Sequence, residues 1–179
     1  MRLFIAIELS NEMRCQLGGI AKTLRERSCG GRFVPLENMH VTMHFIGESN
    51  DLAGAAEAMR ESCRGIRPFT LKLGGYTYFA GSGSSGKTSV VEVTGDLDEL
   101  GILKETLESA LADRGFSQDR KHFRPHITLG RNVEHDELVT EELRDTKLDA
   151  ETTVTGLTLF ESQRIKGGMV YLPLHREKF

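Results

Sequence analysis

The chain contains 179 residues, of which 39% are hydrophobic and 27% are charged, and its formal net charge at pH 7 is −3. This composition is typical of a globular protein with one domain or two small intertwined lobes. The negative charge excludes a protein that wraps long nucleic acid electrostatically, but it is compatible with a local basic cleft for an RNA end or a nucleotide.

The N-terminal stretch at residues 2–8 is too short, and too soon interrupted by charge, for a signal peptide. No apolar run reaches the length of a membrane span. Cys15, Cys29 and Cys63 form no Cys-x-x-Cys pair, so we expect reduced thiols. These features together predict a cytoplasmic protein that is not attached to a membrane.

The first half of the chain alternates strand and helix patterns. Its first segment is apolar on both faces of a strand, which indicates a central or well-covered strand. Ser10 is a suitable N-cap for the helix that follows, whose apolar residues recur at helical spacing. The predicted elements are a strand at 3–9, a helix at 10–27, an extended piece at 32–35, a strand at 40–46, a helix at 51–64 and one or two strands at 69–79.

The second half follows the same order. Asp96 and Glu99 resemble a capping box at the start of a leucine-rich helix that ends at Gly115. An acidic helix follows the next strand, and two strand patterns close the chain. The predicted elements are a strand at 89–93, a helix at 96–115, a strand from 126, a helix at 134–145 and strands at 152–160 and 169–175.

Two segments recur at nearly the same offset. His-Val-Thr-Met at 40–43 returns as His-Ile-Thr-Leu at 126–129, and Gly-Tyr-Thr-Tyr-Phe at 75–79 returns as Gly-Leu-Thr-Leu-Phe at 156–160. A shared offset over several elements indicates internal duplication. Because no linker separates the halves, we predict a single domain over residues 1–179 with two pseudo-symmetric lobes.

The repeated motif has the period of two that is typical of a β-strand. On such a strand, His40 and Thr42 project from one face, and His126 and Thr128 do so in the second copy. If the two copies face each other, they enclose one site. Two imidazoles supply an acid and a base near neutral pH, and two hydroxyls can bind phosphoryl oxygens. This set of groups is suited to breaking a phosphodiester without a metal ion.

These residues and their surroundings resemble the 2H phosphoesterases. Within that superfamily they are most similar to the RNA 2',3'-cyclic phosphodiesterases, also called LigT-like 2'-5' RNA ligases, and the likeness runs from residue 2 to about residue 175. The supporting segments are Arg-Leu-Phe-Ile-Ala-Ile at 2–7, Val-Pro at 34–35, Glu-Asn at 37–38, Phe-Ile-Gly-Glu at 45–48 and Arg-Pro at 124–125, together with the two motifs.

The resemblance implies an α+β fold, bilobal and duplicated, with antiparallel-rich sheets that flank a central cleft and helices on the outside. It also implies an enzyme that hydrolyses RNA 2',3'-cyclic phosphate ends to 2'-phosphomonoesters, with reversible 2'-5' ligation in some relatives. No cofactor is expected. The implied partners of this monomer are RNA ends or tRNA fragments with a 2',3'-cyclic phosphate and small cyclic nucleotides.

The family's functional residues transfer to matching positions of this chain. The implied roles are His40 as proton donor, His126 as proton acceptor, Thr42 and Thr128 as phosphate-binding hydroxyls, and Arg131 and His44 as further substrate-binding residues. His44 stands where the family usually has lysine or arginine. Exposed aromatic rings stack on bases in RNA recognition, and the candidates here are Phe45, Phe79 and Phe123, of which we expect at least two to pack in the core.

One alternative is a metal-dependent hydrolase. His40 with His44, and His122 with His126, are each four residues apart, a spacing that returns to the same face of a strand. Four imidazoles on facing strands would suit zinc. Pro125 and the position of His122 ahead of the predicted strand count against this arrangement.

A second alternative is a nucleoside triphosphate site, because residues 81–88 match the Walker A pattern. That loop binds phosphates only when a helix follows it. Here the β-branched segment at 89–93 indicates a strand, so we interpret the loop as a hairpin connection. A third alternative keeps the same cleft but makes the chain a non-catalytic RNA-end-binding protein.

Overall fold

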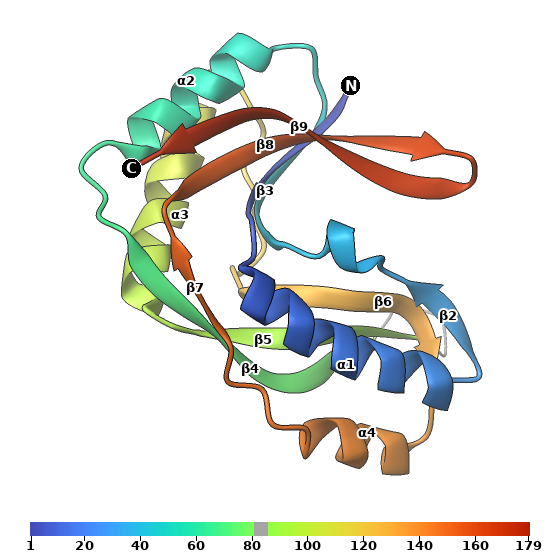
Figure 1. The fold of residues 1–179 in the computed structure, drawn as a ribbon. Helices are drawn as coiled ribbons and strands as arrows, with labels where there is room; N and C mark the ends of the chain where they lie inside the picture. Colours follow the sequence, from blue (N-terminus) through green and yellow to red (C-terminus); the bar gives the residue numbers. More distant parts are fainter. Residues whose placement is uncertain (81–85) are drawn as a thin grey trace.

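The computed structural model describes residues 1–80 and 86–179, and within these residues it contains two antiparallel sheets and four α-helices (Figure 1). The helices are α1 (Asn11–Arg27), α2 (Leu52–Cys63), α3 (Leu97–Ala112) and α4 (Glu137–Arg144), with a short 3₁₀ turn η1 (Leu36–Asn38). The strands are β1 (Arg2–Ile7), β2 (Gly30–Phe33), β3 (Val41–Glu48), β4 (Phe69–Ala80), β5 (Lys87–Gly95), β6 (His126–Glu134), β7 (Glu151–Val154), β8 (Gly156–Ile165) and β9 (Gly168–Lys178).

The first sheet, here called sheet A, has the order β3-β1-β8-β9, and the second, sheet B, has the order β2-β6-β5-β4-β7. Helices α2 and α3 pack together over sheet A, and helices α1 and α4 pack together over sheet B (Figure 1). Every pairing of neighbouring strands is antiparallel. The α+β fold with outer helices, predicted from the sequence, is therefore confirmed.

The two halves of the chain exchange a strand. In sheet A, the first-half strands β3 and β1 are extended by β8 from the second half, and in sheet B the second-half strands β6 and β5 are extended by β4 from the first half. The strands β4 and β8 are the ones that carry the related segments at 75–79 and 156–160. Sheet B contains β2 as a further strand from the first half, so each sheet combines strands of both halves, and the two motif strands, β3 and β6, lie in different sheets.

The helices form where the apolar spacing predicts them. In α1, Met13, Leu17 and the later apolar residues of the stripe are buried, and the Ser10 hydroxyl oxygen accepts a hydrogen bond from the Met13 amide at 3.1 Å. Burial of each such side chain contributes about 1.5–3 kcal/mol. Among the helices in residues 1–80 and 86–179, none is both long and apolar enough to cross a membrane.

Two local predictions are wrong. The Asp96 side chain does not cap α3, because its carboxylate accepts a hydrogen bond from the Thr70 amide of β4 at 2.8 Å. The pattern at 152–160 is not one strand, since β7 pairs with β4 in sheet B whereas β8 pairs with β1 in sheet A. In both cases a partner from the first half of the chain determines the local structure.

The segment that matches the Walker A pattern lies partly outside the described residues, at 81–85. Its described end, Lys87, begins strand β5 and pairs with Ala80 of β4, so a strand follows the loop, as predicted, and not the helix that a triphosphate site requires. The Lys87 ammonium donates a hydrogen bond to the His135 carbonyl at 3.2 Å and lies 4.4 Å from the centre of the Tyr78 ring.

Candidate active site

The two motif strands have the alternating faces that their sequence predicts. Val41 of β3 and Ile127 of β6 belong to the hydrophobic core and are at most 1% exposed. Thr42 and Thr128 point to the opposite, partly exposed faces of their strands. His126 is the first residue of β6, whereas the first motif histidine lies one residue before β3 begins.

Each motif strand also carries a bulge three residues after its histidine. The pairing of β3 with β1 skips Met43, and the pairing of β6 with β5 skips Leu129. A bulge shifts the side-chain alternation by one residue. The fifth residue after each histidine therefore turns to the same face as the motif, and both of these residues, Phe45 and Arg131, line one cleft.

This cleft has a volume of about 650 Å³ and is formed by β1, β2, β3 and β6 together with the β8–β9 hairpin. Its lining contains His40 and Thr42 and an aromatic floor that includes Phe4 and Tyr171. The other charged residues of its lining are all arginines, namely Arg2, Arg32, Arg131 and Arg164. A chain of negative net charge therefore presents a positively charged cleft, which is complementary to an anion.

Hydrogen bonds fix the orientation of the His40 ring. Its Nδ1 lies 2.7 Å from the Asn38 carbonyl oxygen, which can only accept, so Nδ1 carries the proton and donates it. In the neutral ring, Nε2 then accepts a hydrogen bond from the Thr42 hydroxyl at 2.8 Å. The ring also packs 4.9 Å from the Phe4 ring and edge-on, at 5.5 Å, to the Tyr171 ring. The nitrogen left for proton exchange is Nε2.

The surroundings of His40 lower its pKa below the ordinary histidine value. Burial is the largest cause, and the hydrogen bond to the Asn38 carbonyl opposes it. The positive charges of Arg131, Arg14 and His126 lower the pKa of His40 further. Without a ligand, this cleft therefore favours a neutral His40.

His126 has the same main-chain support. Its Nδ1 donates a hydrogen bond to the Arg124 carbonyl oxygen at 2.6 Å, which again leaves Nε2 for proton exchange. The ring meets the Phe79 ring edge-on with centroids 5.1 Å apart, and the Arg124 guanidinium stacks on Phe79 at 4.8 Å. His126 and Thr128 do not line the cleft; they lie beside it on β6, the strand that contributes Arg131. His126 nevertheless interacts electrostatically with His40, since its positive charge contributes to the lowered pKa of the His40 ring.

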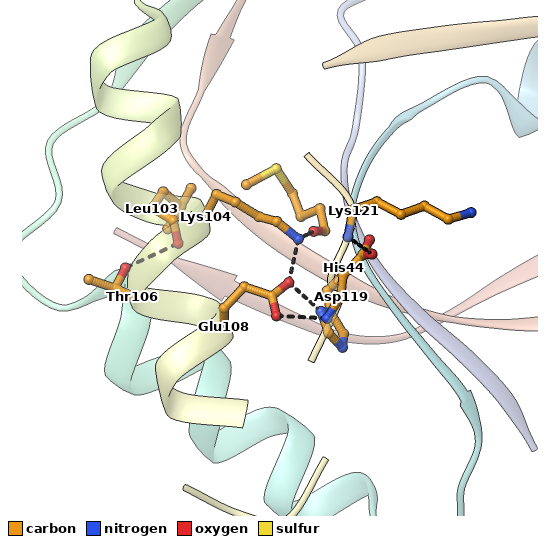
Figure 2. Close-up of polar contacts among 8 residues, drawn as sticks. His44, Leu103, Lys104, Thr106, Glu108, Asp119 and Lys121 are labelled. Carbon is orange, nitrogen blue, oxygen red and sulfur yellow. Dashed lines mark hydrogen bonds and ion pairs between the residues drawn. The ribbon is translucent and has the colours of Figure 1, made fainter. Parts of the chain in front are cut away.

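His44 lies elsewhere, in contrast to the expectation that it contacts substrate. Because of the bulge at Met43 it points toward α3, where it is 1% exposed and donates a hydrogen bond from Nδ1 to the Glu108 carboxylate at 2.6 Å (Figure 2). The Lys104 ammonium contacts the same carboxylate and donates to the Met43 carbonyl at 2.6 Å. The second oxygen of Glu108 accepts from the Asp119 amide at 3.3 Å. The network thus joins β3 to the segment that precedes β6.

Charge complementarity holds this network together. Burial by itself would raise the pKa of Glu108, but the hydrogen bonds from Lys104 and His44 outweigh it and hold the pKa below its ordinary value. The carboxylate therefore stays ionised and pairs with the lysine. This pair occupies the outer face of sheet A, on the opposite side from the cleft.

The same geometry contradicts the four-histidine metal site, because the histidines of each proposed pair do not lie on one face. His44 faces α3 while His40 faces the cleft, and His122 is an exposed residue ahead of β6. In residues 1–80 and 86–179, no three His, Cys, Asp or Glu side chains come together as metal ligands.

Several cleft residues have no counterpart in the predicted site. They are Arg2, Arg32, Asn38, Arg164 and Tyr171. Asn38 donates a hydrogen bond from its amide group to the Met169 carbonyl at 2.7 Å, which ties the turn before His40 to the β8–β9 hairpin. The Glu-Asn pair before the first motif pointed to Asn38, but nothing in the sequence indicated that the hairpin reaches the cleft.

Comparison with known proteins gives a consistent result. The family described as the 2'-5' RNA ligase superfamily matches residues 14–166. The RNA 2',3'-cyclic phosphodiesterase of Thermotoga maritima is 32% identical over 183 residues, which cover 100% of this chain and 96% of the relative. The crystal structure of TT0787 of Thermus thermophilus matches with a TM-score of 0.80 at 25% identity, over 99% of this chain and 97% of that one. E. coli LigT complexed with 3'-AMP matches with a TM-score of 0.77 at 27% identity, over 99% and 97%.

Proposed function

Because this chain belongs to the 2'-5' RNA ligase superfamily of 2H phosphoesterases, we propose that it hydrolyses 2',3'-cyclic phosphates at RNA ends. The product is a 2'-phosphomonoester, and the reaction needs no metal ion. The proposed acid and base are the two motif histidines, His40 and His126.

One observation carries this proposal. Both histidines donate Nδ1–H to the main-chain carbonyl two residues earlier, at 2.7 Å for His40 and 2.6 Å for His126. The same tautomer is thereby set in both rings, and both offer Nε2 for proton transfer. This support suits an acid–base pair, because Nδ1 holds each ring in place while Nε2, which in His40 accepts from the Thr42 hydroxyl, remains the nitrogen that can exchange a proton.

The proposed step is an in-line displacement at phosphorus. His126 Nε2 takes a proton from a water molecule, whose oxygen forms a bond to phosphorus. The bond from phosphorus to the ribose 3' oxygen breaks, and this oxygen receives the proton of His40 Nε2. One proton has then moved from His40 to His126 by way of the reactants, and solvent restores the starting state. Each transfer is worth about 10²–10⁴ in rate.

The remaining groups stabilise the charge on the phosphorus oxygens. We assign the Thr128 hydroxyl as a donor to the non-bridging oxygens, joined by the Thr42 hydroxyl once His40 is protonated at Nε2 and no longer accepts from it, and the Arg131 guanidinium as their positive partner. Arg131 supports this assignment because it lines the cleft next to His40 and lowers the pKa of that ring. Groups that are already aimed at developing charge usually provide the largest contribution to catalysis.

Substrate binding also favours the protonated form of His40, the proposed proton donor. His40 must be protonated to act as donor, although its pKa is lowered in the free protein. A bound phosphodiester anion opposes the positive charges that lower this pKa, so binding raises it again. We therefore propose that His40 takes up a proton when substrate binds.

Phe45 is the aromatic residue that we assign to base stacking. It is 46% exposed, it lines the cleft, and the Arg2 guanidinium lies 5.1 Å from the centre of its ring. Phe123, by contrast, packs against the core, and Phe79 supports His126. Exposed rings of this kind bind unstacked RNA bases.

The same residues serve 2'-5' ligation if a ribose 5'-hydroxyl replaces the attacking water. We propose that the chain acts as a monomeric single domain on RNA ends, tRNA fragments and small cyclic nucleotides. Cys15, Cys29 and Cys63 are free thiols, which supports a cytoplasmic location.

The test is a short RNA with a terminal 2',3'-cyclic phosphate, incubated with EDTA and the wild-type protein or its variants. We expect the wild type to form a 2'-phosphate, and His40→Ala and His126→Ala to lose about 10²–10⁴ in rate each. The matched control is His122→Ala, which changes an exposed histidine ahead of β6.

Each alternative has its own outcome in this experiment. Activity that EDTA removes and zinc restores, with a loss in His122→Ala, would establish the metal-dependent hydrolase. Tight binding of the RNA without turnover by the wild type would establish a non-catalytic RNA-end-binding protein.

A further inference from the structure

A second group of positive charges lies at the sheet A side of the cleft. Arg2 is on β1 and Arg164 is on β8, the two central strands of that sheet, which pair antiparallel. Both arginines are exposed and line the cleft with Phe45. Arg131, which we assign to the reacting phosphate, comes from the other sheet.

These two arginines lack carboxylate partners. Within residues 1–80 and 86–179, neither Arg2 nor Arg164 forms an ion pair, and the cleft lining contains no Asp or Glu. Arginines elsewhere on the surface do pair with glutamates, namely Arg27, Arg114, Arg124, Arg144 and Arg176. The guanidinium groups in the cleft are therefore free to bind an external anion.

Their position relative to the catalytic histidine is set by strand geometry. The Phe4 ring is 4.9 Å from the His40 ring, and Arg2 follows on the same face of β1. Two residues along an antiparallel strand span about 7 Å. Arg2 therefore lies one step outward from Phe4 along β1, beside the ring of Phe45, and Arg164 lies beyond the Phe160 that pairs with Phe4, at the same end of the sheet.

We infer that Arg2 and Arg164 form a second anion subsite, which binds the phosphodiester on the 5' side of the terminal nucleotide. This inference rests on the proposed function. Guanidinium groups bind phosphate oxygens in pairs of hydrogen bonds, which gives both affinity and direction. The protein consequently selects RNA ends over cyclic mononucleotides, and the RNA strand leaves the cleft past the β8–β9 hairpin.

Two substrates separate this subsite from the reacting centre. Adenosine 2',3'-cyclic phosphate has no phosphate other than the reacting one, whereas the dinucleotide ApA with a terminal 2',3'-cyclic phosphate adds one phosphodiester on the 5' side. The quantity to measure is the ratio of kcat/KM for the dinucleotide to kcat/KM for the mononucleotide. It is compared for the wild type, Arg2→Ala, Arg164→Ala and the control Arg60→Ala, which changes an exposed arginine of α2 outside the cleft.

We expect a wild-type ratio of about ten or more, because a hydrogen bond to a charged group contributes roughly a tenfold to hundredfold preference. Arg2→Ala and Arg164→Ala should bring the ratio toward one, and Arg60→Ala should leave it unchanged. The slope of log kcat/KM against log salt for the dinucleotide should decrease by about 0.7 for each lost phosphate contact.

A wild-type ratio of one overturns the inference and leaves the proposed function intact, since the mononucleotide is still hydrolysed. Equal losses on both substrates in Arg164→Ala also overturn it, because they place this arginine at the terminal nucleotide. If the wild type hydrolyses neither substrate, it is the proposed function that fails.

Discussion

The two copies of the His-x-Thr-x motif share a backbone and differ in what surrounds it. In both copies Nδ1 donates to a carbonyl two residues earlier, the strand bulges three residues after the histidine, and the fifth residue enters the cleft. That fifth residue is Phe45 in the first copy and Arg131 in the second. One half of the chain therefore contributes an aromatic ring to the cleft, and the other contributes a positive charge.

The fourth residue after each motif histidine also differs between the two copies. In the first copy it is His44, which bonds to Glu108 behind the sheet. In the second copy it is Gly130, where an added Cβ would lie 2.8 Å from a methyl group of Val133, so no side chain fits. The repeated backbone gives the two imidazoles the same main-chain hydrogen bond, while the residues around them differ between the two copies.

Apart from the two histidines themselves, the largest effect is expected at Arg131, the charged member of the fifth-residue pair. Replacing it by alanine removes positive charge from the reacting phosphate, so we expect Arg131→Ala to lower kcat by about 10²–10³. Steady-state kinetics with a cyclic-phosphate RNA measures this loss. Arg120→Ala, an exposed arginine in the segment before β6, is the matched control. Similar kinetics for the two variants would contradict the assigned role.

The next effect is on stability and belongs to the first copy alone. Glu108→Gln breaks a mostly buried charge pair, so we expect a loss of about 3 kcal/mol in the free energy of unfolding. In a protein of this size that corresponds to a decrease in Tm of roughly 6–12 °C. Thermal unfolding followed by circular dichroism measures it, with Glu105→Gln on the exposed face of α3 as control. A Tm equal to that of the control would mean that the network does not stabilise β3.

A smaller effect is expected at Phe45, which is the fifth residue after His40 and the counterpart of Arg131. Phe45→Ala should raise KM by roughly tenfold with little change in kcat, because stacking on a base contributes about 1–3 kcal/mol to binding. Phe45→Tyr keeps the ring and should retain the wild-type KM. A fall in kcat without a rise in KM would show that Phe45 acts on the reacting group instead.

The smallest effect concerns the protonation of His40. Its pKa is lowered by burial and then by neighbouring positive charges, including Arg131. Sulfate, an anion that does not titrate near neutral pH, should therefore raise the pKa of His40, and so should Arg131→Ala without a ligand. Titration of the imidazole by nuclear magnetic resonance measures both shifts. If sulfate leaves this pKa unchanged, His40 does not face the anion.

The lowered pKa of His40 in the free protein, and its rise when an anion binds, also predict the pH dependence of the reaction. The pKa values of the free enzyme govern kcat/KM, and those of the substrate complex govern kcat. As the proton donor, His40 should produce the alkaline limb, which lies at lower pH for kcat/KM than for kcat. If the limb that moves between the two profiles is the acidic one, His40 is the base and the roles are reversed.

The sequence was sufficient for the parts of the site that depend on local periodicity. Alternation with period two placed His40 with Thr42, and His126 with Thr128, on the partly exposed faces of their strands, opposite to the core. It failed for His44, because the bulge that turns this residue away arises from pairing with β1. No feature of a single strand reveals where its neighbour will skip a residue.

Arg2 and Arg164 show a second limit on predicting the site from the sequence. They lie more than 160 positions apart in the sequence, and only the pairing of β1 with β8 brings them to one end of the cleft. Arg131 could be predicted, since it lies three residues after Thr128, at a position where the family resemblance implies a substrate-binding arginine. Residues adjacent to a motif can be inferred from it, whereas residues contributed by a distant strand require the sheet order.

The crossing of β4 and β8 into opposite sheets has a consequence for the independence of the two halves. If the chain were cut between β4 and β5, the first fragment would keep β1 and β3 but lose β8, which neighbours β1 in sheet A. The second fragment would keep β5 and β6 but lose β4 and β2, which neighbour them in sheet B. Neither half of this chain therefore contains a complete sheet, and each motif strand depends on the other half for its support.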